Sequence, residues 1–408
     1  MDLYNRFSYW RNNMLRKTLG FFFALVLLLT SFSFAEETYF SVEDEVDIND
    51  LGMIVEEETV REKKDSDGAF LMTLTFTGDF TIGGDNYHHK DLFTPELKKH
   101  DNDINFVMQN VKSLFMDDDL TVVNFEGTLT DTKFVPNKKK ENEFLFNITP
   151  SAVSVLPDNG VEAVSLANNH VFDHGTEGFT DTQNALDGAG VLYSTSTKPA
   201  IYSYKDQIQV ALLSYLCIDR YGSSFKRHHE EGEFTEEFLQ YDTFEEAVQA
   251  DIRNAKELYD VVIVSFHWGV EKNYSPTDNQ INLGHLAVDA GADLVIGHHP
   301  HRIQPIECYN GKYICYSLGN FCFAGHNKPS DMSAIIFQAR FRVKETSVSF
   351  KDFRIIPIRI SSKKDQNDFI PYIFGNGHET DAIVTVLTDA NNTKKLPDAV
   401  TDIPLEFR

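Results

Sequence analysis

Positive charge is scarce in this sequence. Its 408 residues include 37 lysines and arginines against 62 aspartates and glutamates, which gives a net charge of −25. A surface with that balance repels phosphate backbones, so we expect no nucleic-acid partner. The acidic residues are densest at 36–68, with 13 acidic and 3 basic side chains. Such a stretch cannot bury enough apolar surface to offset its ordering entropy, and we interpret it as a flexible acidic linker.

Cysteine is also scarce, and none of the four cysteines has C-x-x-C spacing. They are Cys217, Cys308, Cys315 and Cys322. Their number and spacing argue against a disulfide-stapled scaffold and against a cysteine-rich zinc site. We interpret them as core thiols, and a disulfide bridge in an oxidising compartment is the alternative.

Long hydrophobic runs are absent except near the start of the sequence. Residues 19–35 follow Arg16 and Lys17 and end with the small residues Ser33 and Ala35. This is the layout of a secretory signal, so residues 1–35 are predicted to be a signal peptide. A run of this length can also span a bilayer, and an uncleaved membrane anchor is the alternative. Both interpretations place the rest of the chain outside the cytoplasm, with membrane contact only through this segment.

Short apolar runs alternate with helical stretches from residue 69 onwards. The runs are rich in valine, isoleucine, leucine, phenylalanine and threonine, which is typical of buried strands. We predict strands at 70–79, 120–127, 161–170, 259–269, 292–301 and 313–321, and helices at 176–189 and 243–258. This alternation predicts an α/β fold in which many strands are buried on both faces.

The pattern changes in the last part of the sequence. Residues 333–343 and 347–360 alternate apolar and polar side chains like a pair of antiparallel strands. We therefore expect residues 331–408 to complete the same domain that residues 69–330 begin. No internal repeat is visible in the sequence.

Polar residues stand at the carboxyl ends of the predicted strands. In open α/β sheets the functional crevice lies outside these ends, so six strands would bring their polar residues together. The residues are Asp79, Glu126, Asn169, His170, His267, His299, His301 and Asn320. Six such endings in one sequence favour a shared site over a set of unrelated loops.

Carboxylates, an amide oxygen and imidazoles are typical ligands of a transition-metal site. A pair of divalent ions about 3.5–4 Å apart needs a bridging carboxylate, for which Glu126 is the candidate. The other ligands would divide between the two ions, with Asp79 and either His299 or His301 at the first, and Asn169, His267 and the remaining histidine at the second.

His170 is predicted to act on the substrate. It lies three residues before Asp173, and a carboxylate that orients an imidazole is a common device beside metal sites. We expect His170 to stabilise the transition state or donate a proton, and direct metal ligation is the alternative. Five other polar residues are predicted to bind substrate or support the ligands: Asn124, Asn168, Glu271, His298 and Asn320.

Six motifs give the sequence a resemblance to a known family. They are "GDFTIGGD" (78–85), "NFEG" (124–127), "ANNHVFDHG" (167–175), "HWGVE" (267–271), "GADLVIGHHPH" (291–301) and "SLGNF" (317–321). The series, spread over about residues 70–325, resembles the CapA capsule-synthesis family. That family is associated with poly-γ-glutamate synthesis and belongs to the calcineurin-like metallophosphatase superfamily.

The resemblance implies a four-layer α-β-β-α sandwich, in which two sheets pack face to face and helices cover their outer faces. It also implies two divalent ions, of Mn, Fe or Zn, at the carboxyl ends of the strands. The superfamily's Asp-x-His motif corresponds here to Asp79, Phe80 and Thr81. The first ion therefore lacks a histidine, and we expect it to bind weakly or to be a hard ion such as Mn²⁺.

These features together predict an extracytoplasmic protein of capsule or poly-γ-glutamate synthesis that hydrolyses a phosphoester or a similar anionic group. One alternative is a non-catalytic accessory subunit of a membrane-bound polymer synthase or export complex, which binds an anionic polymer. A hydrolase or transferase of γ-glutamyl amides is another. The metal pair separates them, because a polymer guide needs only charge, whereas a hydrolase needs an open coordination position.

Overall fold

The computed structural model of the protein describes residues 63–84, 91–133, 144–218, 243–388, 396 and 398–407. The predicted signal or anchor at 1–35 and most of the acidic linker at 36–68 lie outside these residues. Within the described part of the chain, no helix is both long enough and apolar enough to cross a membrane.

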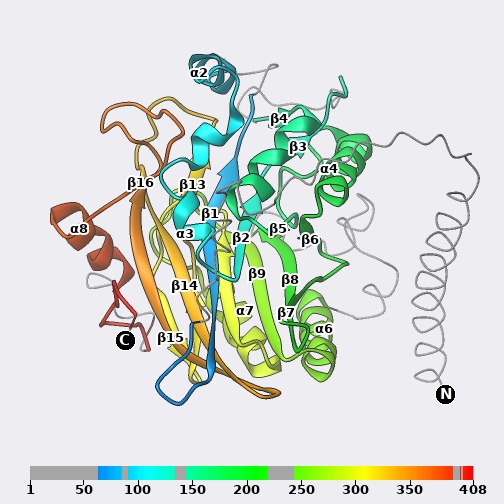
Figure 1. The fold of residues 1–408 in the computed structure, drawn as a ribbon, viewed down its shortest axis with the longest axis vertical. Coiled ribbons are helices and arrows are strands. Elements are labelled where there is room, and N and C mark those ends of the chain that lie inside the picture. The colour runs from blue at the N-terminus through cyan, green and yellow to red at the C-terminus, as the bar shows by residue number, and fades with distance from the viewer. Residues whose placement is uncertain are drawn as a thin grey trace, which may run out of the picture. The chain divides into compact units, whose positions relative to one another are not determined.

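Two mixed sheets organise the described residues (Figure 1). The first sheet has the order β16 (Tyr372–Ile373), β15 (Ser347–Arg359), β14 (Ser333–Lys344), β1 (Phe70–Thr81), β2 (Leu120–Phe125), β5 (Ala163–Ser165) and β6 (Leu192–Ser194). A further strand, β13 (Asn320–Phe323), pairs with the last residues of β1, after the part of β1 that pairs with β14. The second has the order β11 (Ile306–Tyr309), β12 (Lys312–Cys315), β10 (Leu294–His298), β9 (Val261–Gly269), β8 (Ile208–Ile218) and β7 (Ala200–Tyr204). A short pair, β3 (Thr128–Leu129) with β4 (Asn147–Ile148), lies apart from both.

Apolar side chains from both sheets meet in one central core. Phe76 and Val122 of the first sheet belong to the same buried cluster as Leu212, Ile263 and Ile296 of the second. Burial on both faces explains why strands such as β9 are apolar at every position from Val261 to Val264 rather than at alternate ones.

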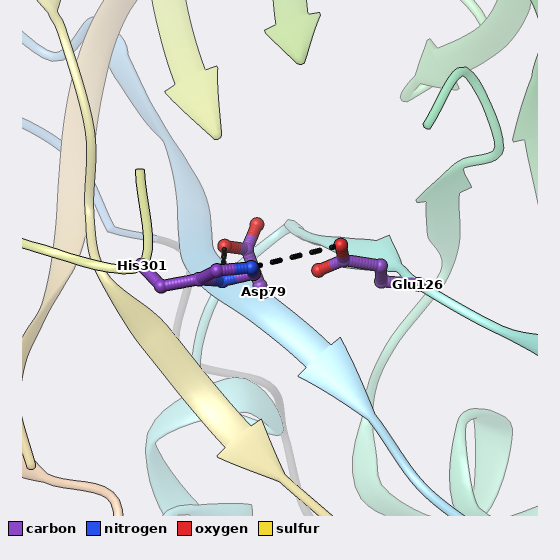
Figure 2. Close-up of side chains that lie close together, drawn as sticks. All are labelled: Asp79, Glu126 and His301. Atoms are coloured by element: carbon purple, nitrogen blue, oxygen red, sulfur yellow. Dashed lines mark ion pairs between the residues drawn. The ribbon is translucent and has the colours of Figure 1, made fainter. Parts of the chain in front are cut away.

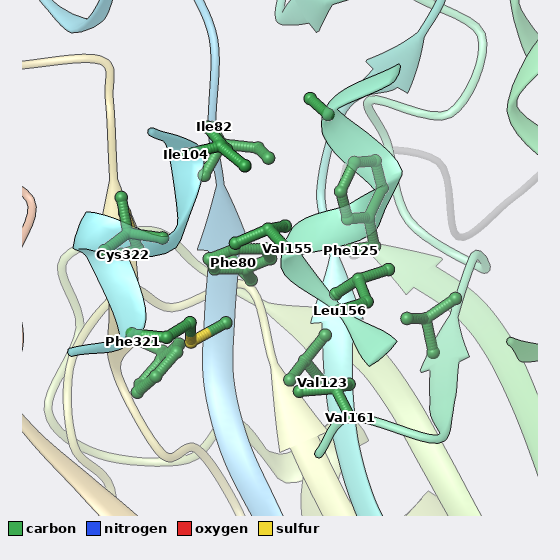
Figure 3. Packing of buried hydrophobic residues seen from close by; sticks show 14 of the residues in the cluster. Phe80, Ile82, Ile104, Val123, Phe125, Val155, Leu156, Val161, Phe321 and Cys322 are labelled. Atoms are coloured by element: carbon green, nitrogen blue, oxygen red, sulfur yellow. The ribbon is translucent and has the colours of Figure 1, made fainter. Parts of the chain in front are cut away.

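Helices cover the outer face of each sheet. Against the first sheet lie α2 (Phe93–Lys99), α3 (Lys112–Phe115), α4 (Gly175–Ala189) and three 3-10 helices at 104–108, 150–155 and 157–159. The buried cluster on this face includes Phe80, Val123 and Phe125 (Figure 3). Against the second lie α6 (Phe244–Leu258) and α7 (Asp278–Ala290). The helix α8 (His378–Leu387) adds Ile383 and Leu387 to the central core. The central core between the sheets, and one core between each sheet and its helices, give the α-β-β-α layers that the resemblance implied. This confirms the fold class.

Local sequence explains where the covering helices begin and end. Thr243 caps α6 by accepting a hydrogen bond from the backbone of Glu246, and Thr277 and Gln280 form a reciprocal capping box at α7. Gly190 ends α4 at its C-terminus, where it takes a left-handed conformation with φ of 71°. The helices predicted at 176–189 and 243–258 are thus confirmed as α4 and α6.

One predicted strand is wrong in a way that matters for the site. The run at 313–321 forms two strands, because β12 ends at Cys315 in the second sheet and β13 begins at Asn320 in the first. Gly319, with φ of 78°, makes the turn between them. Asn320 therefore begins a strand that pairs with β1, and does not end one as predicted.

The strands predicted at 333–343 and 347–360 are confirmed as β14 and β15, and β14 pairs antiparallel with β1. The residues after 330 thus extend the first sheet. Cys308, Cys315 and Cys322 are free thiols. Cys315 and Cys322 are fully buried, as expected of core residues, whereas Cys217 and Cys308 are only partly buried.

Asp118 is a carboxyl group that the fold keeps protonated at neutral pH. It lies just before β2, at the opposite end of that strand from Glu126. Burial raises its pKa to about 8, with a further contribution from the charges of Glu162 and Asp119, although Thr121 donates a hydrogen bond of 2.6 Å to it. Because the folded-state pKa lies above the ordinary value of 3.8, stability is lost as pH rises from about 4 to about 8.

We expect Asp118→Asn to remove that loss. Its melting temperature should exceed that of the wild type at pH 8, and the difference should shrink towards pH 4, as measured by calorimetry across this range. Asp117→Asn is the matched control, because Asp117 is an exposed neighbour, and it should give no such pH-dependent gain. A gain for Asp118→Asn that is the same at pH 4 and pH 8 would contradict the assignment.

Candidate metal centre

The candidate site lies where β1, β2, β9 and β10 end. Two glycines allow the backbones to approach closely enough there. A Cβ atom on Gly78 would lie 2.1 Å from the carbonyl oxygen of Gly319, and one on Gly297 would lie 2.1 Å from that of Tyr316. Gly78 and Gly297 immediately precede Asp79 and His298, so the absence of side chains at 78 and 297 sets the positions of Asp79 and His298.

Asp79, Glu126 and His301 form the first half of the site (Figure 2). They come from the end of β1, the loop after β2 and the loop after β10. One possible ligand atom from each lies within 4.8 Å of the other two, a grouping that could hold a metal ion. Asp79 is fully buried, and its Oδ2 lies 2.9 Å from Nδ1 of His301.

The carboxylate of Glu126 occupies the centre of the site. It is 1% exposed, and neither carboxylate oxygen accepts a hydrogen bond from the described residues. Its Oε1 lies 3.6 Å from Nε2 of His267, 3.8 Å from Nε2 of His170 and 4.0 Å from Nε2 of His301. Two ligand atoms on one tetrahedral ion would be about 3.4 Å apart. The spacing therefore fits a cation between the carboxylate and the imidazoles better than direct hydrogen bonds.

His267, Asn169 and His299 form the second half. Nε2 of His267 lies 2.7 Å from Oδ1 of Asn169, and its ring centroid is 4.9 Å from that of His299. With the Glu126 oxygen nearby, this half offers two imidazoles, an amide oxygen and a carboxylate. The structure thus places all six predicted ligands in one region, with His301 beside Asp79 and His299 beside His267. Among the described His, Cys, Asp and Glu residues, only Asp79, Glu126 and His301 form a group of three whose ligand atoms all lie within 4.8 Å of one another.

Three of the predicted supporting residues hold the ligands in place. Asn124 donates a hydrogen bond of 2.9 Å to Oδ1 of Asp79, and the same amide nitrogen lies 3.3 Å from Nδ1 of His267. Asn168 donates one of 3.1 Å to Asn124. His298 is 4% exposed and its Nδ1 lies 3.3 Å from Asp79. Such contacts fix the orientation of metal ligands.

The histidine loop has unusual backbone geometry. His299 and His301 have φ angles of 92° and 52°, in the left-handed region that residues other than glycine rarely adopt. Lys272 donates its backbone N–H to the carbonyl of Pro300 at 2.7 Å, and the buried Arg302 donates to the carbonyl of His301 at 2.6 Å. A conformation held in this way at a polar cleft is typical of a functional site.

His170 is oriented as the sequence predicts. Its Nδ1 donates to Oδ2 of Asp173 at 2.8 Å, and Asp173 also accepts from the backbone N–H of Phe146 at 2.7 Å. The other ring nitrogen therefore faces Glu126. Burial by itself would lower the pKa of His170, but the negative charge of Asp173 and its hydrogen bond raise it above the ordinary value. The contact with Asp173 thus stabilises the charged form of the imidazole.

Without an ion, the site carries a negative charge on Asp79 and a positive charge on His301, and His301 must release its proton to bind a metal. Burial would raise the pKa of Asp79, but its hydrogen bonds with His298 and His301 hold it well below the usual range. Burial would lower the pKa of His301, but Glu126 and Asp79 raise it to about 9. Burial and the charge of His299 lower the pKa of His267 well below the ordinary value, so it is neutral and able to bind a metal.

A cavity of about 310 Å³ opens beside Glu126 and His301. One wall is aromatic, formed by Phe144, Phe146 and Phe323. Exposed Glu271, which we predicted from its motif, lies at the rim, and Thr81 and Asn320 also face the cavity. Sequence reasoning missed the basic residues that line the cavity, which are Lys272, Arg302, His326 and Lys328. Lys272 and Arg302 had a signal, because they directly follow the "HWGVE" and "HHPH" motifs.

Comparison with known proteins adds family information to this geometry. A family model described as "Bacterial capsule synthesis protein PGA_cap" matches residues 73–325. The PGA biosynthesis protein CapA of Bacillus subtilis (strain 168) is 31% identical over 321 residues, which cover 76% of this chain and 79% of that protein. A probable polyglutamine synthesis accessory protein of Mycobacterium tuberculosis (strain ATCC 25618 / H37Rv) is 30% identical over 213 residues, or 50% of this chain and 55% of that protein.

Among solved structures, the calcineurin-like phosphoesterase YfkN from Bacillus subtilis aligns with a TM-score of 0.43 at 14% identity. The alignment covers 78% of this chain and 97% of that one.

Proposed function

The chain belongs to the family of bacterial capsule synthesis proteins described as PGA_cap, and on that premise we propose that it is a metal-dependent hydrolase of a phosphoester or similar anionic group in capsule polymer synthesis. The observation that carries the proposal is Glu126. A buried carboxylate without hydrogen bonds, with three imidazole nitrogens 3.6 to 4.0 Å from one oxygen, is costly unless a cation fills the gap.

The donor set fits two divalent ions of Mn, Fe or Zn. Asp79, His301 and Glu126 would hold one, and Asn169, His267, His299 and Glu126 the other. Such ions act as Lewis acids on phosphoryl oxygens and lower the pKa of a bound water to roughly 7.

His170 would serve the reaction from the cavity side of the site. Asp173 fixes its ring through Nδ1 and raises its pKa, which would favour a proton on Nε2. That proton can stabilise negative charge on the reacting group and pass to the leaving oxygen. Lys272 and Lys328 at the rim supply positive charge where an anionic substrate would enter.

We place this reaction outside the cytoplasm. The support is the run at 19–35 with Arg16 and Lys17 before it, which would either be cleaved as a signal or anchor the protein in the membrane. Membrane-bound subunits of a polymer synthase are the partners that this location and the family favour.

The test is metal content and hydrolysis in the same preparations. We expect mass spectrometry to find close to two metal ions per full-length chain, and the chain to hydrolyse a generic aryl phosphate with Mn²⁺ added. His299→Ala should lose one ion, and its rate should fall by at least about 10²-fold, because the second half of the site loses an imidazole. A wild-type chain that takes up no metal under any loading would overturn the proposal.

A second candidate is the binding of an anionic polymer without catalysis. The basic residues that line the cavity favour it, as does the name of the Mycobacterium tuberculosis relative, a probable polyglutamine synthesis accessory protein. A chain that binds two ions but hydrolyses neither aryl phosphates nor γ-glutamyl amides would support this candidate. Turnover of γ-glutamyl amides alone would indicate a hydrolase or transferase of that bond.

A further inference from the structure

We propose that Thr81 and Asn320 complete the coordination of the ion held by Asp79, Glu126 and His301, and that they make this position selective for hard ions such as Mn²⁺ and Mg²⁺ over Zn²⁺. The inference rests on the metal site of the proposed function. From the sequence, the first ion lacks a histidine and is expected to bind weakly or to be a hard ion such as Mn²⁺; the inference favours the hard ion and names the residues that would select it.

The first observation is that both side chains contain an unpaired buried oxygen. Thr81 is 1% exposed and Asn320 is 4% exposed. Neither Oγ1 of Thr81 nor Oδ1 of Asn320 has a hydrogen-bond partner among the described residues. Buried polar atoms are nearly always satisfied by a partner, so these two oxygens call for one that the protein itself does not provide.

The second observation is where the strand pairing puts them. Asp79 is the register partner of Asn320 in the parallel pair β1 and β13. Thr81 lies two residues after Asp79, so both side chains are on the same face of β1, while Phe80 between them packs in the core. Thr81 and Asn320 line the same cavity as Glu126 and His301. The two residues thus lie on the cavity side of the first half of the site.

The resulting donor set differs between the two halves. The first half would offer oxygens from Asp79, Glu126, Thr81 and Asn320 with one imidazole. The second half offers two imidazoles, from His267 and His299. Oxygen donors suit Mg²⁺ and Mn²⁺, whereas imidazoles suit Zn²⁺ and Fe. Threonine hydroxyls and asparagine side chains hold Mg²⁺ in nucleotide-binding proteins, so both residue types are capable ligands.

The experiment compares Thr81→Val with Thr77→Val by calorimetric titration of the metal-stripped full-length chain with Mn²⁺ and Zn²⁺. Valine keeps the shape of threonine and removes the oxygen. Thr77 is the matched control because it is a buried threonine of the same strand whose hydroxyl already donates to the carbonyl of Gly78. Thr81→Val should weaken one of the two Mn²⁺ sites by at least about tenfold and leave the other unchanged.

Two further variants sharpen the result. Thr81→Ser keeps the oxygen and should bind Mn²⁺ within about threefold of the wild type. Thr81→His supplies a second imidazole to the first half and should shift the ratio of Zn²⁺ to Mn²⁺ affinity by at least about tenfold towards Zn²⁺. The metal-free Thr81→Val chain should melt no lower than the wild type, since it loses an unpaired hydroxyl, whereas Thr77→Val should melt lower.

The outcomes separate this inference from the proposed function. Two Mn²⁺ sites in the wild type, with the same affinities in Thr81→Val, would overturn the role of Thr81 and leave the metal site intact. No ion in the wild type would overturn both. Loss of affinity in Thr81→Val and Thr77→Val alike would indicate general damage to β1 and would also overturn the inference.

Discussion

Replacing Glu126 with glutamine is expected to remove both ions and to reduce hydrolysis by at least about 10³-fold. In the proposed site the two metal positions share this carboxylate, so one substitution would affect both halves. Lewis-acid stabilisation by the ions is worth several kcal/mol of transition-state energy, which corresponds to a rate effect of that size. Glutamine keeps the shape of the side chain, so the loss is one of charge and of a ligand atom.

Stability gives the same substitution a second signature. Burial, and then the negative charge of Asp79, raise the pKa of Glu126 to about 7. Because this lies above the ordinary value of 4.5, the metal-free wild type loses stability as pH rises from about 4.5 to about 7. Glu126→Gln has no carboxyl group to ionise, so above pH 7 the metal-free variant should melt at a higher temperature than the metal-free wild type.

Mn²⁺ should reverse this order. A ligand present at 100 times its Kd stabilises the folded state by about 2.7 kcal/mol, so the wild type should melt higher with Mn²⁺ and the variant should not. Glu271→Gln is the matched control, because Glu271 is an exposed carboxylate at the rim of the same cavity, and it should keep both ions. A Glu126→Gln chain that still binds two Mn²⁺ ions would show that the carboxylate is not the bridge.

The sequence alone predicts most of this site, because each site residue follows an apolar run that can be recognised locally. An apolar run followed by a carboxylate, amide or imidazole can be seen in one dimension, and the carboxyl ends of neighbouring parallel strands lie together. Asp79, Glu126 and His301 could therefore be grouped although 222 residues separate the first from the last. The pairing of His301 with Asp79, and of His299 with His267, needed the structure, since both histidines lie on one loop.

Other parts of the fold depend on contacts between distant segments. Phe146 and Phe323 pack edge-to-face in the wall of the cavity, with ring centroids 6.2 Å apart, yet neither has a sequence signal for a binding wall. Asn320 could be placed beside Asp79 only once Gly319 was seen to carry the chain from the second sheet to the first. The capping pair Thr277 and Gln280, by contrast, is a local sequence signal for the start of α7.

His170→Asn is the second substitution with a large expected effect, and it should separate catalysis from metal binding. The amide nitrogen of asparagine can keep the hydrogen bond to Asp173, but the variant has no ring nitrogen to hold a proton towards the cavity. We expect kcat for an aryl phosphate to fall by about 10²- to 10⁴-fold, the usual contribution of a positioned proton donor. Metal content and the rise in melting temperature with Mn²⁺ should stay at wild-type values.

Asp173→Asn should give a smaller loss of kcat than His170→Asn, because it weakens the orientation of the imidazole without removing it. His378→Gln is the control, since His378 begins α8, outside the cavity, and it should leave all three measurements unchanged. The alternative predicted from the sequence is that His170 is itself a ligand, and Nε2 lies close enough to Glu126, at 3.8 Å, for that to be tested. If His170→Asn loses an ion together with activity, His170 is a ligand, and the proton donor must be sought elsewhere in the cavity.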